Sequence, residues 1–182
     1  MDTLFTPDLT LEPLVAGHAE AMFDVLSEPE LYRYLDFGPP PSLDHLRGVY
    51  EALEARVSPD GSRLWLNWVV RPRDEAPVGF VQATVSGADA WVAYVLSREF
   101  WGRGYAFQAT QAVIEHLRAT CGVARFLATV EAGNERSVRL LQRLGFRAAS
   151  EAEVQEHELS ATERLFVLGV PPSHDVPCRR CP

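Results

Sequence analysis

The most informative segment of this chain is Trp91-Val-Ala-Tyr-Val-Leu-Ser-Arg-Glu-Phe-Trp-Gly-Arg-Gly-Tyr-Ala106. Its first six residues are apolar or aromatic, which predicts a strand, and a short loop leads from it to Gly102 and Gly104. A helix is predicted to follow. A helix N-terminus presents unpaired N–H groups and the positive end of the helix dipole, and glycines let a ligand approach the backbone closely. This arrangement is typical of a site for phosphate groups.

A Gly-x-Gly sequence is weak evidence alone, because a tight strand-to-helix turn without a ligand has the same composition. Two nucleotide-binding folds are excluded. The third glycine of a Rossmann fingerprint falls on Phe107, and the strands before the turn are joined by short turns, which predicts antiparallel pairing. The Gly-Lys-Ser/Thr sequence of a P-loop does not occur in the chain.

Hydrophobic periodicity and turn residues predict about seven strands and about four helices in an α/β (α+β) fold with a mixed, mainly antiparallel central sheet. One strand–helix–strand crossover lies at its centre. We expect a single domain at 1–170 and a C-terminal tail at 171–182, where Pro and polar residues dominate. The predicted strands are 4–14, 64–71, 78–86, 91–96, 125–131, 147–157 and 164–170, and the predicted helices are 18–27, 42–56, 106–119 and 134–144.

The charge and composition of the chain argue against nucleic acids, membranes and metal ions as partners. The formal net charge is −8, with 25 acidic residues against 17 basic ones, so binding to a nucleic-acid backbone is not expected. The apolar stretch 64–70 is too short to span a bilayer, and Met1-Asp2-Thr3 shows no secretory signal, which favours the cytoplasm. Zinc takes four ligands, whereas the tail offers three candidates, His174, Cys178 and Cys181, so no metal is expected.

The sequence Trp101-Gly-Arg-Gly-Tyr-Ala106 resembles the acetyl-CoA pyrophosphate loop of the GNAT superfamily, in the form seen in its RimJ/RimL-like branch. The superfamily pattern is Gln/Arg-x-x-Gly-x-Gly/Ala, and here Trp101 replaces its first residue. The loop acts through backbone N–H groups, so this replacement leaves its role intact.

A second match lies downstream and in the expected order. The sequences Asn134-Glu-Arg-Ser137 and Leu140-Leu-Gln-Arg-Leu-Gly-Phe146 resemble the family's Asn-x-x-Ser…Leu-Gly-Phe helix. The segments 5–14 and 27–35 are similar to the opening strand and the first helix and loop of the same branch. The resemblance therefore spans about residues 3–170.

The resemblance implies an acetyl-CoA-dependent N-acetyltransferase that acts on a primary amine, with a protein or peptide N-terminal α-amine as the first expectation. Acetylation of a small-molecule amine and a non-catalytic acyl-CoA-binding module are the alternatives. A homodimer is one assembly that the branch allows. The residues expected at the acetyl-CoA site are Val95, Leu96, Arg98, Trp101, Gly102, Arg103, Gly104, Tyr105, Ala106, Asn134 and Ser137.

Catalytic roles follow from the same resemblance. Many GNAT enzymes protonate the leaving thiolate with a Tyr that lies seven residues after the Asn, and this position is Leu141 here. Ser137 is then the candidate to hydrogen-bond the thiolate. Two carboxylates are candidates for the base: Glu156, ten residues after Phe146 in the predicted strand, and Glu131, acting through a water molecule.

Overall fold

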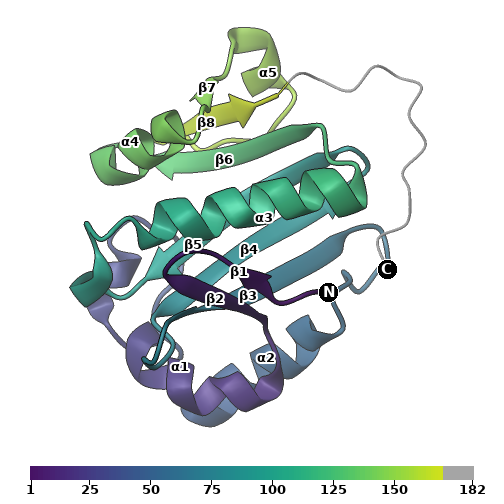
Figure 1. The fold of residues 1–182 in the computed structure, drawn as a ribbon. Helices are drawn as coiled ribbons and strands as arrows, with labels where there is room; N and C mark the ends of the chain where they lie inside the picture. Colours follow the sequence, from purple (N-terminus) through teal and green to yellow (C-terminus); the bar gives the residue numbers. More distant parts are fainter. Residues whose placement is uncertain (170–182) are drawn as a thin grey trace.

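A computed structural model describes residues 1–169 of the chain (Figure 1). One eight-stranded sheet runs through them, in the order β1-β2-β3-β4-β5-β6-β8-β7. The parallel neighbours are β5 and β6, whereas the other strand pairs are antiparallel, which confirms the predicted mixed, mainly antiparallel sheet. The strands are β1 (Leu4–Phe5), β2 (Leu9–Pro13), β3 (Leu64–Pro72), β4 (Gly79–Ser86), β5 (Asp89–Leu96), β6 (Arg125–Glu131), β7 (Arg147–Ala148) and β8 (Glu163–Leu168).

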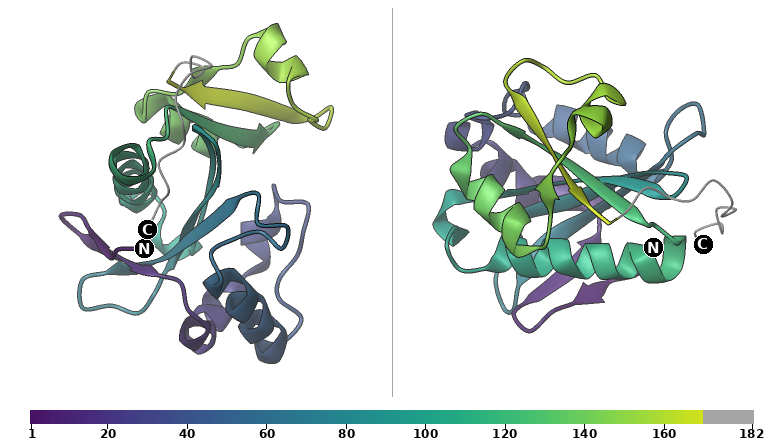
Figure 2. Two further views of the ribbon diagram at one scale, coloured as in Figure 1. Left: turned by 90° about the vertical axis from the view of Figure 1, so that its right-hand side faces the viewer. Right: turned by 90° about the horizontal axis from the view of Figure 1, so that it is seen from above.

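Helices cover both faces of the sheet, with α3 on one side and α1 and α2 on the other (Figure 2). The larger core lies on the α3 side, where Trp68 and Phe126 are fully buried against residues of α3 and α4. The helices are α1 (Ala19–Leu26), α2 (Leu43–Glu54), α3 (Tyr105–Cys121), α4 (Glu135–Arg143) and α5 (Glu151–Gln155), with short 3₁₀ turns at Ala16–His18, Pro29–Tyr32 and Arg98–Phe100.

The strands at the centre show why the chain folds as three layers. The strand β3 is buried at five consecutive positions, 66–70, because helices cover it on both sides. In β4, buried and partly buried residues alternate along the strand. Between these helix layers, β3, β4 and β5 form an antiparallel meander that leads directly into the glycine turn.

The parallel pair of β5 and β6 is short. Its register joins Asp89 with Arg125, Ala90 with Phe126 and Trp91 with Leu127, and the later residues of the two strands are not paired with each other. The crossover helix α3 connects the two strands, as predicted. Because the pairing covers only the first three residues of each strand, the C-terminal part of β5, 92–96, has a free backbone edge on its β6 side within residues 1–169.

Two predicted strands are corrected by the structure. The segment 4–14 forms a hairpin of β1 and β2, because Pro7 and Asp8 lie in a turn. The segment 147–157 is predicted as one strand, but it contains the two-residue β7 followed by α5. Ser150 caps this helix by accepting a hydrogen bond from the Glu153 N–H, while the Glu153 carboxylate accepts one from the Ser150 N–H, which forms a capping box.

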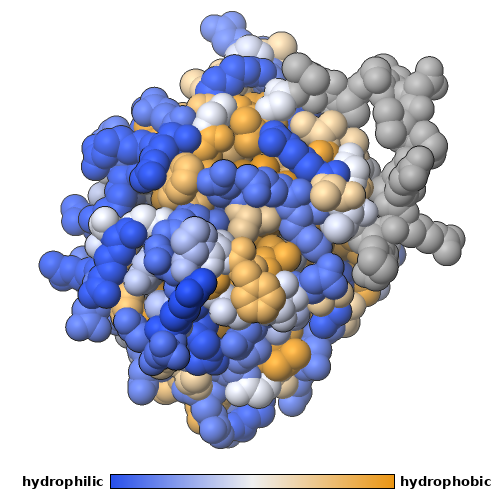
Figure 3. Space-filling view, in the orientation of Figure 1, coloured by the Kyte–Doolittle hydropathy of each residue, from blue (hydrophilic) through white to orange (hydrophobic). Residues whose placement is uncertain are grey.

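The surface carries small apolar areas. Figure 3 shows the face that includes α3 and the β1–β2 hairpin, where hydrophilic residues predominate and hydrophobic ones lie between them. Phe5 and Phe37 are the most exposed large apolar side chains among the described residues. Within residues 1–169, no helix combines the length and the apolar composition needed to cross a bilayer. The predicted tail, with His174, Cys178 and Cys181, lies outside the described residues.

Candidate active site

The turn before α3 has the backbone geometry that the sequence predicts. Gly102 and Gly104 have φ angles of +79° and +80°, a left-handed conformation that glycine adopts without strain. Gly104 is the N-cap of α3, and no side chain caps the helix there. A Cβ added at either glycine would meet no atom within 4 Å. The space around both glycines is therefore open, so a ligand is able to approach the backbone of the turn closely.

The C-terminal half of β5 leads into this turn. Val95 and Leu96 lie beyond the residues that pair with β6, and both line a cavity beside the turn. The indole N–H of Trp101 donates a 2.7 Å hydrogen bond to the carbonyl oxygen of Leu96. This bond ties the turn to the end of β5. It therefore holds the N-terminus of α3 in a fixed position relative to the free edge of the strand.

The helix α4 forms another wall of the cavity. Asn134 is its N-cap, and its side-chain oxygen accepts a 3.2 Å hydrogen bond from the N–H of Ser137. Arg136 stacks 3.7 Å over the Trp101 ring, and Arg139 also lines the cavity. Arg143 lies 4.1 Å over the ring of Phe107. None of these three arginines forms an ion pair within residues 1–169, so α4 presents net positive charge to the cavity.

The cavity has a volume of about 640 Å³. It extends from the glycine turn to the segment 30–35, which includes part of the 3₁₀ turn Pro29–Tyr32. Glu28 holds this segment against the site, because its carboxylate accepts hydrogen bonds from the Ser97 hydroxyl (2.6 Å) and the Arg98 N–H (3.3 Å). The cavity thus runs from the glycine turn, past the arginines of α4, to the segment 30–35.

Residues 8–147 match the family model described as "Acetyltransferase (GNAT) domain". The chain belongs to the GNAT family of acetyltransferases. A curated relative, the "Uncharacterized N-acetyltransferase p20" of Bacillus licheniformis, is 28% identical over 149 residues, which cover 81% of this chain and 83% of the relative.

Solved structures share the fold of this GNAT domain. The structure of RimL, described as a ribosomal L7/L12 alpha-N-protein acetyltransferase in complex with coenzyme A, has a TM-score of 0.76 and 18% identity, and the match covers 93% of this chain and 98% of RimL. The microcin C7 self-immunity acetyltransferase MccE, in complex with acetyl-CoA and AMP, has a TM-score of 0.75 and 15% identity over 91% of this chain and 94% of MccE.

Most of the residues expected at the acetyl-CoA site of this GNAT domain come together. Two arginines do not line the cavity. The backbone N–H of Arg98 is bonded to Glu28, and the Arg103 guanidinium lies 4.8 Å over the ring of Phe100. The residues that do line it are Val95, Leu96, Trp101, Gly102, Gly104, Tyr105, Ala106, Asn134 and Ser137.

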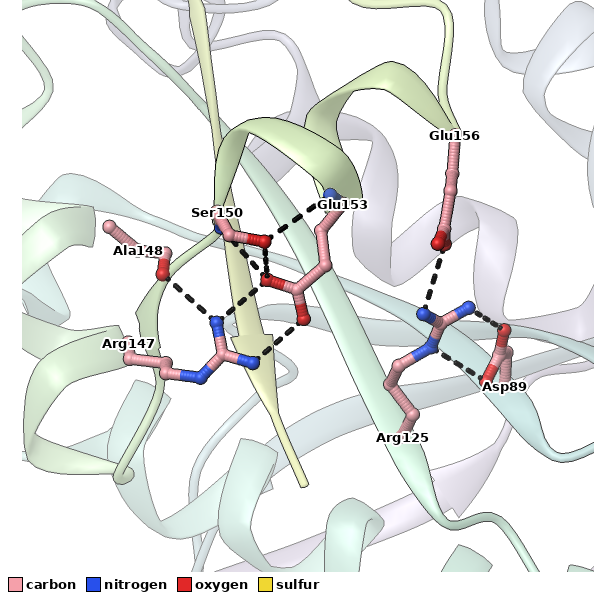
Figure 4. Close-up of polar contacts among 7 residues, drawn as sticks. All are labelled: Asp89, Arg125, Arg147, Ala148, Ser150, Glu153 and Glu156. Atoms are coloured by element: carbon pink, nitrogen blue, oxygen red, sulfur yellow. Dashed lines mark hydrogen bonds and ion pairs between the residues drawn. The ribbon is translucent and has the colours of Figure 1, made fainter. Parts of the chain in front are cut away.

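The two candidate bases lie away from the cavity lining. Glu156 is the C-cap residue after α5 rather than part of a strand, and its carboxylate accepts a 3.1 Å hydrogen bond from Arg125 (Figure 4). Glu131 ends β6 and is the register partner of Glu163 in β8. The acidic residues among those that line the cavity are Glu30 and Glu135, and Glu135 pairs with Arg164 at 3.3 Å.

One residue of the cavity is absent from the sequence-based predictions. Tyr94 of β5 lines it, and its hydroxyl oxygen is buried without a hydrogen-bond partner in the part of the chain that the structure describes. Burial raises the pKa of Tyr94, and the Ser137 side chain opposes part of this rise. The signal available in the sequence is an aromatic hydroxyl within an otherwise apolar strand that leads into the glycine turn.

Proposed function

We propose that this GNAT domain transfers an acetyl group from acetyl-CoA to the N-terminal α-amine of a protein or peptide. The observation that supports the proposal is the single cavity that joins the Gly102–Gly104 turn, the free edge of β5 and the segment 30–35. Transfer requires the thioester and the amine to be held together, and this cavity offers a place for each.

The residues of the cavity fit the chemistry of acetyl-CoA. The first amides of α3, at Tyr105 and Ala106, are placed to hold the diphosphate, and the arginines of α4 add positive charge beside them. Backbone groups of Val95 and Leu96 are placed to bind the pantetheine arm and to polarise the carbonyl oxygen. When bound, acetyl-CoA supplies the acetyl group as a thioester. Asn134 and Ser137 complete the proposed site, with the Ser137 hydroxyl toward the sulfur.

The choice of an α-amine rests on the pKa of the acceptor. An α-amine titrates at about 7.7–8.0 and a lysine amine at about 10.4, so neutralising the lysine costs roughly 3.5 kcal/mol more at a given pH. Neither Glu131 nor Glu156 is among the residues that line the cavity, and of the two acidic residues that do line it, Glu135 pairs with Arg164 and Glu30 is exposed to solvent. An acceptor that loses its proton to water near neutral pH therefore suits this site best. The shared fold of RimL, described as an alpha-N-protein acetyltransferase, supports the same choice.

The test is a panel of acceptors incubated with acetyl-CoA, with thiol release as the measurement. We expect transfer to peptides with a free N-terminus, and none to the same peptides with a blocked N-terminus and one internal lysine. Transfer to small amines alone would replace the proposal with small-molecule acetylation. Tight binding of CoA by calorimetry without transfer to any amine would indicate a non-catalytic acyl-CoA-binding module.

A further inference from the structure

The carboxylate of Glu28 links two parts of the cavity wall that are far apart in the sequence. It accepts a 2.6 Å hydrogen bond from the Ser97 hydroxyl and a 3.3 Å hydrogen bond from the Arg98 N–H. Ser97 is 6% exposed and follows the last residue of β5, and Arg98 begins the 3₁₀ turn that leads to the glycine turn. Glu28 comes directly before the other 3₁₀ turn, Pro29–Tyr32. The contact therefore ties the start of the segment 29–35 to the end of β5.

The Glu28 side chain serves the turn beside β5 rather than its own turn. Glu28 and Ser97 are the N-cap residues of the two 3₁₀ turns, and neither caps its own turn through its side chain. The first N–H groups of a helical turn have no partner within it and favour a negative charge. The Glu28 carboxylate supplies that partner at Arg98, across 70 positions of the sequence. This contact joins the two turns to each other and contributes little within either one.

The segment 29–35 continues from this contact to the other diverging strand. Most of its residues line the cavity. The Tyr32 hydroxyl donates a 2.6 Å hydrogen bond to the carbonyl oxygen of Leu26 at the end of α1. A Cβ built on Gly133 would lie 3.9 Å from the ring of Tyr34, so this ring lies beside the turn between β6 and α4. The segment therefore extends from the end of β5 to the end of β6, where the two strands are no longer paired.

We propose that Glu28 is a positioning residue for the acceptor: its two hydrogen bonds hold the segment 29–35 across the ends of β5 and β6, so that the acceptor amine lies beside the thioester. This inference rests on the proposed function and adds to it how the acceptor side of the cavity is kept in place. The glycine turn has separate support, because the Trp101 indole N–H bonds to the carbonyl oxygen of Leu96. Loss of the Glu28 contact should therefore loosen the segment and leave the glycine turn in position.

The first measurement needs no acceptor. Amide hydrogen exchange is compared by mass spectrometry between the wild-type protein and Glu28→Ala. The N–H groups of Leu31 and Leu35 bond to carbonyl oxygens within the same stretch of chain, so peptides that cover 29–35 report the order of the segment. We expect these peptides to exchange about 10-fold faster in Glu28→Ala, since hydrogen bonds to a charged group are the stronger ones. Exchange in α3 and the Kd of CoA, measured by calorimetry, should change less than about threefold.

The second measurement separates acceptor binding from the chemical step. When a binding segment is ordered for part of the time, the apparent affinity of its ligand falls by the ordered fraction. We expect Glu28→Ala to raise the KM of an acceptor peptide about 10-fold and to change kcat less than about threefold. Glu28→Gln keeps a side-chain oxygen for the Ser97 hydroxyl and should recover most of the lost affinity. The effects of Glu28→Ala and Ser97→Ala should not add in the double variant, because both remove the same contact.

Glu20→Ala is the matched control. Glu20 is an exposed carboxylate of α1 that pairs with Arg47 at 3.3 Å and does not line the cavity. We expect it to leave the exchange of the segment 29–35, the Kd of CoA and both kinetic constants at their wild-type values.

Unchanged exchange of the segment 29–35 in Glu28→Ala would overturn the proposal. Faster exchange with an unchanged KM for the acceptor would also overturn it, because the segment would then not hold the acceptor. Equal losses of affinity for CoA and for the acceptor would mean that Glu28 supports the whole site. An inactive wild-type protein would refute the proposed function alone, and hydrogen exchange would still decide whether Glu28 orders the segment.

Discussion

At the scale of single residues, the glycines at the two ends of α3 allow two effects of a substitution to be measured separately. One is the loss of folding stability from a strained backbone, and the other is the loss of CoA affinity. Gly104 at the N-cap and Gly122 at the C-cap both adopt left-handed φ angles, +80° and +67°, and a Cβ at either would meet no atom within 4 Å. Gly104 lines the cavity and Gly122 does not. We expect Gly104→Ala and Gly122→Ala to destabilise the fold similarly, by about 1 kcal/mol. Only Gly104→Ala should weaken CoA binding, by about 10-fold or more, because its methyl group occupies space beside the helix amides.

Urea unfolding and calorimetry with CoA measure the two effects separately. A matched loss of CoA affinity in Gly122→Ala would show that the backbone change, rather than the lost approach to the amides, is responsible. The glycine turn was predictable because glycine is the residue that adopts positive φ angles without strain. The presence of Tyr94 in the cavity wall was not, because it depends on which face of β5 packs toward α4, and that is decided by contacts between distant segments.

At the scale of elements, the sequence predicts long periodic segments well and short ones poorly. The strand at 125–131 and the helix at 134–144 match β6 and α4 closely. The strand β6 is an apolar run buried on both faces, and α4 buries Val138 and Leu141 on one face. The prediction of one strand at 147–157 was wrong. The two-residue β7 exists only through pairing with β8, and the local capping box of Ser150 and Glu153 determines the helix that follows.

The capping box predicts a pH-dependent stability. The side chain of Arg147 donates to both oxygens of Glu153 at 2.7 and 2.8 Å, and together with Ser150 it lowers the pKa of Glu153 from 4.5 to about 2 (Figure 4). A carboxylate with a lowered pKa stabilises the fold above its unfolded pKa, and this contribution is lost as the pH falls from about 4.5 toward 2. We expect Glu153→Gln to lower the free energy of unfolding by about 1–2 kcal/mol at pH 7, since solvent screens the half-exposed Arg147.

The difference between wild type and Glu153→Gln should shrink between about pH 5 and pH 3, measured by urea unfolding at each pH. Glu158→Gln is the control, because Glu158 is exposed and forms no ion pair within residues 1–169, and we expect it to leave stability unchanged. A difference that stays constant over this pH range would mean that Glu153 acts through packing rather than through its charge.

At the scale of the whole molecule, one cluster joins the two halves of the sheet where β5 and β6 are still paired. Arg125 of β6 donates two hydrogen bonds to Asp89 of β5, at 3.0 and 2.6 Å, and one to Glu156 of α5. The Arg125 side chain is 9% exposed, whereas Glu156 is 52% exposed. Asp89 is thus the main partner of a buried charge at the closed end of the diverging strands, and Glu156 is a secondary one.

This geometry gives the two carboxylates different expected effects. Asp89→Asn should lower the free energy of unfolding by about 2–4 kcal/mol, because it leaves a buried guanidinium without its bidentate partner, and it should also weaken CoA binding as β5 and β6 loosen. Glu156→Gln should cost less than about 1 kcal/mol, since the pair is half exposed, and leave kcat within about threefold. A general base contributes about 100-fold or more to the rate, so the acetyl-transfer rate of Glu156→Gln decides its role. A fall of that size with unchanged stability would make Glu156 the base and would require α5 to move toward the cavity during the reaction.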